Sequence, residues 1–373
     1  LLGGIDLSVG LLTSSQDDSS RRQLMGDLAQ GTLSVVVGTH ALLEPWVKFR
    51  RLGLVVVDEQ QKFGVDQRAA IVAKGSHPDL LILTATPIPR TLALTLYGEM
   101  DISTLAEQPK GRRPVKTLWM DSTRRQEVYG FIRSELEAGR QAYVVCPRIG
   151  PKEAESRLPL EDIFDGSEEV SEKAIAETGK IFREYQKAFP NFRVGLLHGR
   201  MSPAEQKAVF TTFRHQEIHL LVATQIIEVG VDIPNATVMV IEGAERFGLS
   251  QLHQLRGRVG RGEHEAACIL LSDPKDPDAV ERLCTLVEIS DGFRIAEEDL
   301  RLRGPGQLLG KRQAGLPDLK CLQWASQGPW LEVSRAEADQ LLARDPKLAD
   351  PSLAMLRREV FLRFPKLTQK VAS

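Results

Sequence analysis

Short runs of apolar residues, many of them β-branched, alternate along the chain with segments of helical periodicity. In the first part of the chain these runs cover residues 7–12, 33–37, 52–57 and 80–83. Continuous apolar runs of this length are typical of strands buried on both faces, as in parallel sheets covered by helices. The alternation therefore predicts an α/β fold built on a parallel sheet.

The same alternation returns after residues 108–114, a segment of proline, glycine and basic residues that we interpret as a boundary between two units. The strands expected in the second unit are 142–146, 194–197, 219–223 and 238–242. The helices expected there are 123–138, 172–189 and one that begins at the capping box Ser202–Glu205. The acidic segment 151–166 lacks periodicity, so we expect a surface insertion there.

The composition sets outer limits on domain number, partners and compartment. A chain of 373 residues with 42% hydrophobic residues is long enough for two or three domains. Because the net charge is only -2, nucleic-acid contacts depend on local basic segments. Four cysteines without a Cys-x-x-Cys pair favour a reducing compartment, the cytoplasm. No apolar run approaches the roughly 20 residues that span a bilayer, so we expect no membrane partner.

The stretch Gln251–Gly262 interleaves three arginines with three glycines. Arg256, Arg258 and Arg261 stand beside backbone that can pass close to a ligand. A guanidinium group forms bidentate, charge-assisted bonds to phosphoryl oxygens, so this stretch predicts a phosphate site. The alternative is a solvated basic loop.

Two adjacent acids, Asp58 and Glu59, follow the third apolar run at the expected carboxyl edge of the sheet. Such a pair can hold Mg²⁺ while one carboxylate orients or deprotonates an attacking water. Their alternative role is to cap the next helix.

Hydroxyl groups follow two other runs, in Gly38–His40 and in Thr84–Pro87. Hydroxyls and free N–H groups at strand ends can bind phosphate oxygens or relay a change between a nucleotide and a second ligand. Ordinary turn chemistry explains each equally well, and His40 fits a packed or capping histidine better than a proton carrier. A Gly-x-x-x-x-Gly-Lys-Ser/Thr loop is absent from the sequence.

Several of these stretches together resemble a known family. Asp58–Gln61, Thr84–Thr86, Ala223–Asp232 and Gln254–Arg261 resemble motifs II, III, V and VI of superfamily 2 helicases, in that order. Residues 58–68 (DEQQKFGVDQR), 84–91 (TATPIPRT) and 291–315 (DGFRIAEEDLRLRGPGQLLGKRQAG) are similar to the RecG family of bacterial branch-migration helicases. The last stretch matches a translocation hairpin that this family shares with Mfd, the transcription-repair coupling factor. The box at Gln60 and the residues 62–65 favour RecG.

The resemblance implies two RecA-like lobes of the P-loop nucleotidase type, the first incomplete, followed by a helical hairpin and a helical tail. The implied domains are 1–114 for the ATP-binding lobe, 115–285 for the second lobe, 286–320 for the translocation hairpin and 321–373 for the tail. The family's phosphate loop and its amino-terminal wedge domain have no counterpart in the chain, which also starts without methionine. We therefore expect a piece of a longer protein that by itself lacks ATPase activity.

The resemblance also implies roles for individual residues. In catalysis, Asp58 and Glu59 serve Mg²⁺ and the hydrolytic water, and Arg258 and Arg261 are arginine fingers. The other implied roles are ATP binding for Gln254, Gly230 and Asp232; coupling for Gln61, Thr84 and Thr86; DNA binding for Thr39, His40 and Thr224; and translocation for Arg301, Arg303 and Gln313. Gln61 stands where the family usually has histidine, and an amide cannot carry a proton, so we expect mildly altered coupling.

The function implied is that of an ATP-dependent double-stranded DNA translocase that remodels stalled forks and branch-migrates Holliday junctions. Its cofactors are ATP and Mg²⁺, and its expected partners are branched double-stranded DNA and single-stranded DNA-binding protein, with the protein acting as a monomer. The alternatives are an Mfd-type motor that displaces RNA polymerase, a non-catalytic DNA-binding module and an RNA helicase.

Overall fold

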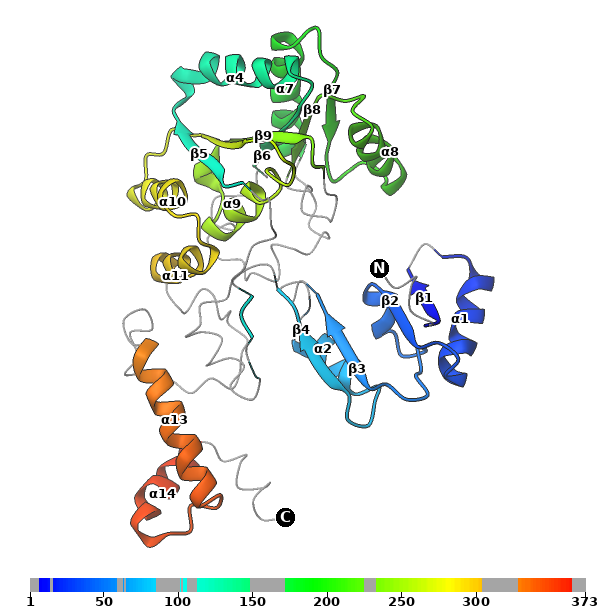
Figure 1. The fold of residues 1–373 in the computed structure, drawn as a ribbon, viewed down its shortest axis with the longest axis vertical. Helices are drawn as coiled ribbons and strands as arrows, with labels where there is room; N and C mark the ends of the chain where they lie inside the picture. The colour runs from blue at the N-terminus through cyan, green and yellow to red at the C-terminus, as the bar shows by residue number, and fades with distance from the viewer. Residues whose placement is uncertain are drawn as a thin grey trace. The chain divides into compact units, whose positions relative to one another are not determined.

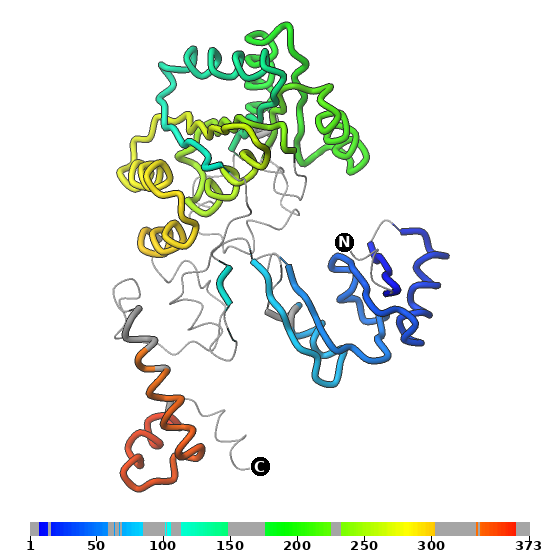
Figure 2. Tube along the Cα trace, viewed as in Figure 1, coloured from blue at the N-terminus to red at the C-terminus, as the bar shows by residue number. Residues whose placement is uncertain are grey.

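The structure is a computed structural model that describes residues 7–13, 16–58, 63, 65–84, 101, 103–105, 113–147, 172–224, 233–303 and 328–363. These residues belong to two compact units, unit 1 up to Thr84 and unit 2 from Asp101 onward. Figure 1 shows the elements of each unit, and Figure 2 traces the Cα path of the chain.

Unit 1 contains the four strands that the apolar runs predict. They are β1 (Val9–Leu12), β2 (Val35–Gly38), β3 (Leu54–Val57) and β4 (Asp79–Ile82). β1 pairs with β2 and β3 with β4, both in parallel. The alternation predicts one continuous sheet, whereas the described residues form two separate pairs. Among the described residues, β2 pairs with β1 and β3 pairs with β4, and no strand pairing joins the two pairs into one sheet.

Helix α1 (Asp18–Gln30) covers the first strand pair, and its two ends follow from local sequence. Asp17 accepts a hydrogen bond from the backbone N–H of Ser20 at 3.0 Å, which satisfies a free donor of the first turn. Gly31 ends the helix with a φ of 75°, a left-handed conformation that glycine adopts without strain. Leu24 and Leu28 of this helix pack on Leu12.

Unit 2 is built on a six-stranded, fully parallel sheet in the order β5-β10-β9-β6-β8-β7. The strands are β5 (Val115–Met120), β6 (Gln141–Cys146), β7 (Val194–Leu197), β8 (Leu220–Thr224), β9 (Ala236–Glu242) and β10 (Ala266–Leu271). Every residue of β6, β8, β9 and β10 is buried. This pattern is typical of strands with helices on both faces.

Two apolar clusters cover the two faces of this sheet. Helices α4 (Arg125–Glu137) and α7 (Glu172–Ala188) pack on one face. On the other lie α8 (Pro203–Arg214), α9 (Leu249–Arg256), α10 (Pro277–Glu288) and α11 (Gly292–Arg303). Figure 1 shows α4 and α7 on the side of the sheet opposite α9 and α10.

The predicted helices and strands of unit 2 are confirmed to within a few residues, including the capping box. Ser202 N–H donates to Glu205 Oε2 at 2.7 Å, and Glu205 N–H donates to Ser202 Oγ at 3.3 Å. The strands β5 and β10 and the helix α10 are additions that the periodicity analysis did not predict. Of the predicted hairpin 286–320, α11 is confirmed as a helix, while residues 304–320 lie outside the described residues.

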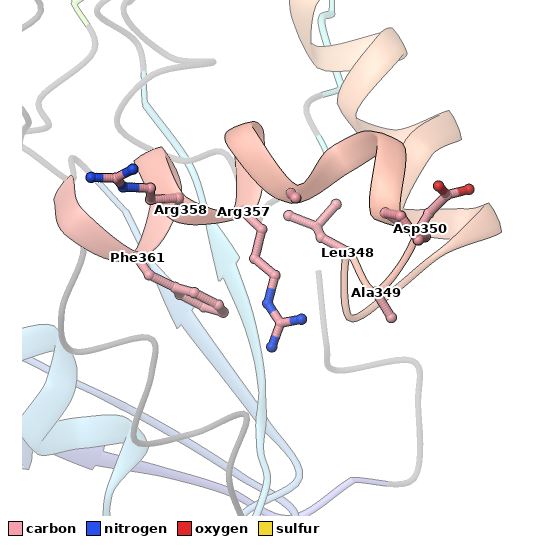
Figure 3. Close-up of a pocket in the computed structure, with 8 residues that line it drawn as sticks. Leu348, Ala349, Asp350, Arg357, Arg358 and Phe361 are labelled. Atoms are coloured by element: carbon pink, nitrogen blue, oxygen red, sulfur yellow. The ribbon is translucent and has the colours of Figure 1, made fainter.

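The tail contains α13 (Gly328–Arg344) and α14 (Ala354–Arg363). A shallow pocket of about 240 Å³ lies between Leu348, Arg357 and Phe361, and Figure 3 shows its lining. The guanidinium of Arg357 stands 5.6 Å from the centre of the Phe361 ring. None of the predicted site residues lines this pocket. Among the described helices, none has the length and apolar character that a membrane crossing requires.

Candidate functional site

The carboxyl ends of β3 and β4 bring two predicted site residues to one sheet edge. Val57 pairs with Ile82, and Leu83 N–H donates to the Val57 carbonyl oxygen at 2.8 Å. Asp58 and Thr84 therefore follow neighbouring strand ends, as the sequence predicts. Mg²⁺ binds through one or two carboxylates together with water and phosphate oxygens, so Asp58 at this edge fits such a site. Glu59, Gln61 and Thr86 lie outside the described residues.

A glycine turn at the end of β2 positions Thr39. A Cβ on Gly38 would stand 2.7 Å from the Leu12 carbonyl oxygen, so the turn requires glycine. The backbone then enters a 3₁₀ turn, His40–Leu43, in which Leu42 N–H donates to the Thr39 carbonyl oxygen at 3.0 Å. Thr39 and His40 are exposed, and the His40 ring stacks on Phe63. The ring contact supports the interpretation of His40 as a packed histidine, and its exposure is compatible with the predicted DNA contact.

The arginine–glycine stretch divides into a buried part and a surface part. Residues up to Arg256 form α9, with Leu252 and Leu255 buried, so this part is not a solvated loop. Arg256 is only 6% exposed, and its guanidinium donates to the carbonyl oxygens of Leu286 (3.1 Å), Ile289 (2.9 Å) and Ser290 (3.0 Å). The prediction that Arg256 binds phosphate is wrong. Its donors hold the segment between α10 and α11, because that segment's carbonyls need partners at a helix end.

The surface part begins after the helix, where Arg258 is half-buried and Arg261 exposed. Gly260 has a φ of 74°, and a Cβ there would stand 2.8 Å from the side chain of Val115. Only glycine fits this conformation and this contact. Arg261 Nε donates to the Gly257 carbonyl oxygen at 3.1 Å. Gln254 is half-buried on α9.

Thr224, the last residue of β8, is fully buried. Its hydroxyl has no hydrogen-bond partner within the part of the chain that the structure describes. A buried hydroxyl without a partner costs on the order of 1–3 kcal/mol, so a ligand oxygen at this strand end would stabilise it. Gly230 and Asp232, predicted to bind ATP, lie outside the described residues.

Helix α11, the first helix of the predicted hairpin, is attached to α9 by a buried hydrogen bond. Asp299 is 2% exposed and accepts from Ser250 Oγ at 2.6 Å. Arg301 is exposed and pairs with Glu298 at 2.6 Å and also with Glu281 of α10. Hydrogen bonds that its guanidinium donates to Glu281 and Glu298 raise the pKa of Arg301, which stays charged. The side chain of Arg303 and the whole of Gln313 lie outside the described residues.

A partly buried ion pair that the sequence analysis did not identify lies on the other face of the sheet. Arg125 of α4 binds Glu242, at the end of β9, through two bonds of 2.6 and 2.8 Å, and Tyr185 of α7 donates to the same carboxylate at 2.9 Å. Burial, followed by the negative charge of Glu242, raises the pKa of Tyr185 well above its usual value. These bonds fix α4 and α7 on β9, a structural role that local sequence patterns do not reveal.

Comparisons with known proteins identify two matching segments and several relatives. Residues 165–263 match the helicase conserved C-terminal domain, and residues 289–368 match the family "ATP-dependent DNA helicase RecG, domain 3, C-terminal". The RecG helicase of Synechocystis sp. is 48% identical over 97% of this chain and 41% of its own length. The RecG helicase of Bacillus subtilis is 44% identical over 95% of this chain and 50% of its own length. The chain thus spans half or less of the length of these relatives.

The chain also matches solved structures. The structure of RecG bound to a three-way DNA junction matches with a TM-score of 0.65 and 38% identity, over 89% of this chain and 40% of that chain. A structure of S. cerevisiae Dbp5 bound to RNA matches with a TM-score of 0.51 over 80% of this chain and 75% of that chain. At 13% identity, the second match supports the fold alone.

The six-stranded parallel sheet covered on both faces, together with the match of residues 165–263 to the helicase C-terminal domain, defines a RecA-like lobe of the helicase class. The match of residues 289–368, which include α11, to the RecG domain narrows this class further. The chain belongs to the RecG family of ATP-dependent DNA helicases.

Proposed function

We propose that the protein, at its natural full length, is an ATP-dependent double-stranded DNA translocase that remodels stalled forks and branch-migrates Holliday junctions. The observation that carries this proposal is the attachment of α11 to α9 through the Ser250–Asp299 hydrogen bond, together with the bonds by which Arg256 of α9 holds the segment just before α11. The helix that leads into the arginine–glycine turn is thereby fastened to the helix of the translocation hairpin. A RecG protein bound to a three-way junction is among the matching structures, which supports branched DNA as the substrate.

In the proposed ATPase cycle, Asp58 and Glu59 hold Mg²⁺ and orient the attacking water, and Mg²⁺ would supply charge neutralisation at the phosphates. Arg258 and Arg261 stabilise charge on the transferring phosphoryl group. The remaining nucleotide and coupling contacts come from Gln254, Gly230, Asp232, Gln61, Thr84 and Thr86. The presence of Asp58 and Thr84 at one strand edge supports this assignment.

In the proposed DNA path, the segment Thr39–His40 and the strand end at Thr224 contact the DNA backbone. Thr39 is exposed at the end of β2, and the buried hydroxyl of Thr224 lacks a partner in the described residues. The hairpin residues Arg301, Arg303 and Gln313 convert the motion of the motor lobes into movement on duplex DNA. In this scheme Arg301 exchanges its pairing with Glu281 for a phosphate contact.

The proposed organisation keeps the domain limits 1–114, 115–285, 286–320 and 321–373. We further propose that the protein acts as a cytoplasmic monomer and that single-stranded DNA-binding protein is a partner. An Mfd-type motor is the second candidate, because α11 belongs to a hairpin that both families share. Binding to RNA polymerase would favour that candidate, whereas the relatives named RecG support the first.

The test measures DNA affinity, DNA-stimulated ATP hydrolysis and junction unwinding on one three-way junction at fixed salt. The unchanged full-length protein should unwind the junction with ATP and Mg²⁺, and Glu59→Gln should abolish hydrolysis and unwinding together. Arg303→Ala or Gln313→Ala should keep most of the DNA binding and ATP hydrolysis while unwinding collapses, because the chemical cycle still runs without moving the duplex. If unwinding falls only in proportion to DNA affinity, the hairpin is a grip and its coupling role is wrong.

A further inference from the structure

His40 and Phe63 form a stacked aromatic pair within unit 1. Their ring centres lie 4.7 Å apart, and the ring planes are inclined by 13°. Both values fit a stacked arrangement of two flat rings in contact. The pair joins two segments that are 23 positions apart in the sequence, so its formation depends on the fold of the unit.

The two rings lie on the segments that follow the strands β2 and β3. His40 directly follows Thr39 at the end of β2, and Phe63 comes five residues after Asp58 at the end of β3. The stack therefore connects the proposed DNA-contacting residue Thr39 with Phe63, which packs on the strand that ends beside Asp58.

An apolar cluster supports the stack from behind. Phe63 packs against Val55, Val57 and Ile71, and the two leucines that follow His40 in the 3₁₀ turn, Leu42 and Leu43, pack against the same cluster. Val55 and Val57 belong to β3, the strand that Asp58 follows. A displacement of the 3₁₀ turn His40–Leu43 would therefore press on this strand through the shared cluster. Packed apolar groups transmit such displacements, since protein interiors have low compressibility.

We propose that His40 is a positioning residue that transmits DNA contact at Thr39 to Asp58, at the end of β3, through its ring stack on Phe63. This inference deepens the proposed motor function and rests on it. The role requires a flat ring at position 40 and a flat ring at position 63. It does not require the imidazole nitrogens, which distinguishes it from direct hydrogen bonding of His40 to DNA.

Three substitutions distinguish the effect of the aromatic ring at position 40 from that of its imidazole nitrogens. His40→Ala removes the ring, and His40→Phe keeps a flat ring while removing the nitrogens. Phe63→Leu keeps an apolar side chain for the cluster but removes the stack, so this variant retains the core packing that Phe63→Ala would lose. Each variant is made in the full-length protein.

The experiment measures ATP hydrolysis against the concentration of three-way junction DNA. His40→Ala and Phe63→Leu should lower the maximal DNA stimulation by up to about tenfold, the largest factor expected from loss of one stacked pair. The DNA concentration that gives half of the maximal stimulation should change less than the stimulation itself. His40→Phe should restore most of the stimulation.

The chain offers a matched control pair in unit 2. His219 and Phe192 are also in ring contact, with centres 5.6 Å apart and planes inclined by 70°. These rings lie between the starts of β7 and β8, where no residue of the proposed site is found. His219→Ala should leave the DNA stimulation at the level of the unchanged protein.

Two results would overturn the inference. His40→Phe with the same defect as His40→Ala would show that the nitrogens matter, and Phe63→Leu with full stimulation would show that the stack does not. Absence of DNA stimulation in the unchanged protein would overturn the proposed function and this inference together, and it is recognisable because no variant is needed to see it.

Discussion

The two units of this chain bury strands of similar sequence to different extents. In unit 2 each residue of β6, β8, β9 and β10 is buried, since helices cover both faces of the sheet. In unit 1, β1 and β3 alternate between exposed and buried residues, and Val9, Leu11, Leu54 and Val56 are all more than 40% exposed. An apolar run thus predicts a strand, whereas the number of covered faces depends on the layers around it.

The units also differ in how charge is placed within them. Unit 2 holds a partly buried ion pair, Arg125–Glu242, and a buried arginine, Arg256, that donates to three backbone carbonyl oxygens and contacts His253. The predicted carboxylate of unit 1, Asp58, is exposed at a strand end. Charge in unit 2 therefore organises helices, whereas the carboxylate of Asp58 in unit 1 lies at the surface.

The largest expected effect concerns ATP hydrolysis by this 373-residue chain alone. We expect hydrolysis no faster than background, because no Gly-x-x-x-x-Gly-Lys-Ser/Thr loop supplies phosphate contacts beside Asp58. Release of phosphate from ATP, measured with and without junction DNA, tests this. Robust turnover that disappears in Glu59→Gln would contradict the prediction and would mean that other residues of unit 1 cradle the phosphates.

The second prediction separates the surface arginines of unit 2 from the buried one. In the full-length protein, Arg258→Ala or Arg261→Ala should lower kcat by roughly three orders of magnitude, far more than nucleotide binding weakens. Arg258→Lys should also be defective, since lysine keeps the charge but loses the fork of donors. Steady-state kinetics with an independent measurement of nucleotide affinity tests this.

Arg246→Ala is the matched control for the arginine series, because Arg246 is a half-exposed arginine of unit 2 paired only loosely, at 3.8 Å, with Glu177 and Glu245. It should leave kcat unchanged. Equal losses in nucleotide affinity and kcat/KM at an unchanged kcat for Arg258→Ala would refute the finger role.

The third prediction compares core positions of the two units. Ile241→Ala, at a fully buried position of β9, should destabilise unit 2 by about 2–5 kcal/mol, because it removes buried methyl groups and leaves a cavity. Leu81→Ala, at a position of β4 that is 48% exposed, should change stability by no more than about 0.5 kcal/mol. Urea unfolding of both variants measures the difference. Equal costs would show that the exposed face of unit 1 is covered in solution.

The fourth prediction concerns alkaline pH and the buried thiol and phenol groups of unit 2. Burial raises the pKa of the Cys268 thiol from 9.0 to about 12 and that of Tyr185 well above 10.0, whereas residues 1–85 contain neither cysteine nor tyrosine. Both groups hold their protons longer in the folded state, so their stabilising contribution is complete below pH 9 and is lost as pH rises toward 12. Each pH unit above 9 for Cys268, and above 10 for Tyr185, should cost unit 2 up to about 1.4 kcal/mol.

Hydrogen-exchange protection factors for β9 and β1, followed from pH 8 to pH 10.5, test this dependence. Cys268→Ala should reduce the alkaline loss in unit 2 and leave unit 1 unchanged. Parallel losses of protection in β1 and β9 would contradict the assignment to buried groups of unit 2.

Local sequence patterns determined much of this protein. The apolar runs located four strands of unit 1 and four of unit 2, and the Ser202–Glu205 capping box fixed the start of α8. The strand β10 carries an apolar run of six residues that the same reasoning could have found. β5 mixes Lys116 and Thr117 with apolar residues, as suits an edge strand, and gave no such signal. These patterns succeed because strand pleating and helix capping depend on residues within a few positions of one another.

Only the tertiary structure decided which arginine of the stretch 251–262 is buried and which lie at the surface. Arg256, Arg258 and Arg261 look equivalent in the sequence, yet Arg256 finds its carbonyl partners 30 to 34 positions away, between α10 and α11. The same holds for the pairing of Glu242 with Arg125, 117 positions apart, and for the stack of His40 on Phe63. Such contacts depend on which helices and strands pack together, and a buried charge must find its partner in that packing because leaving it unpaired is costly.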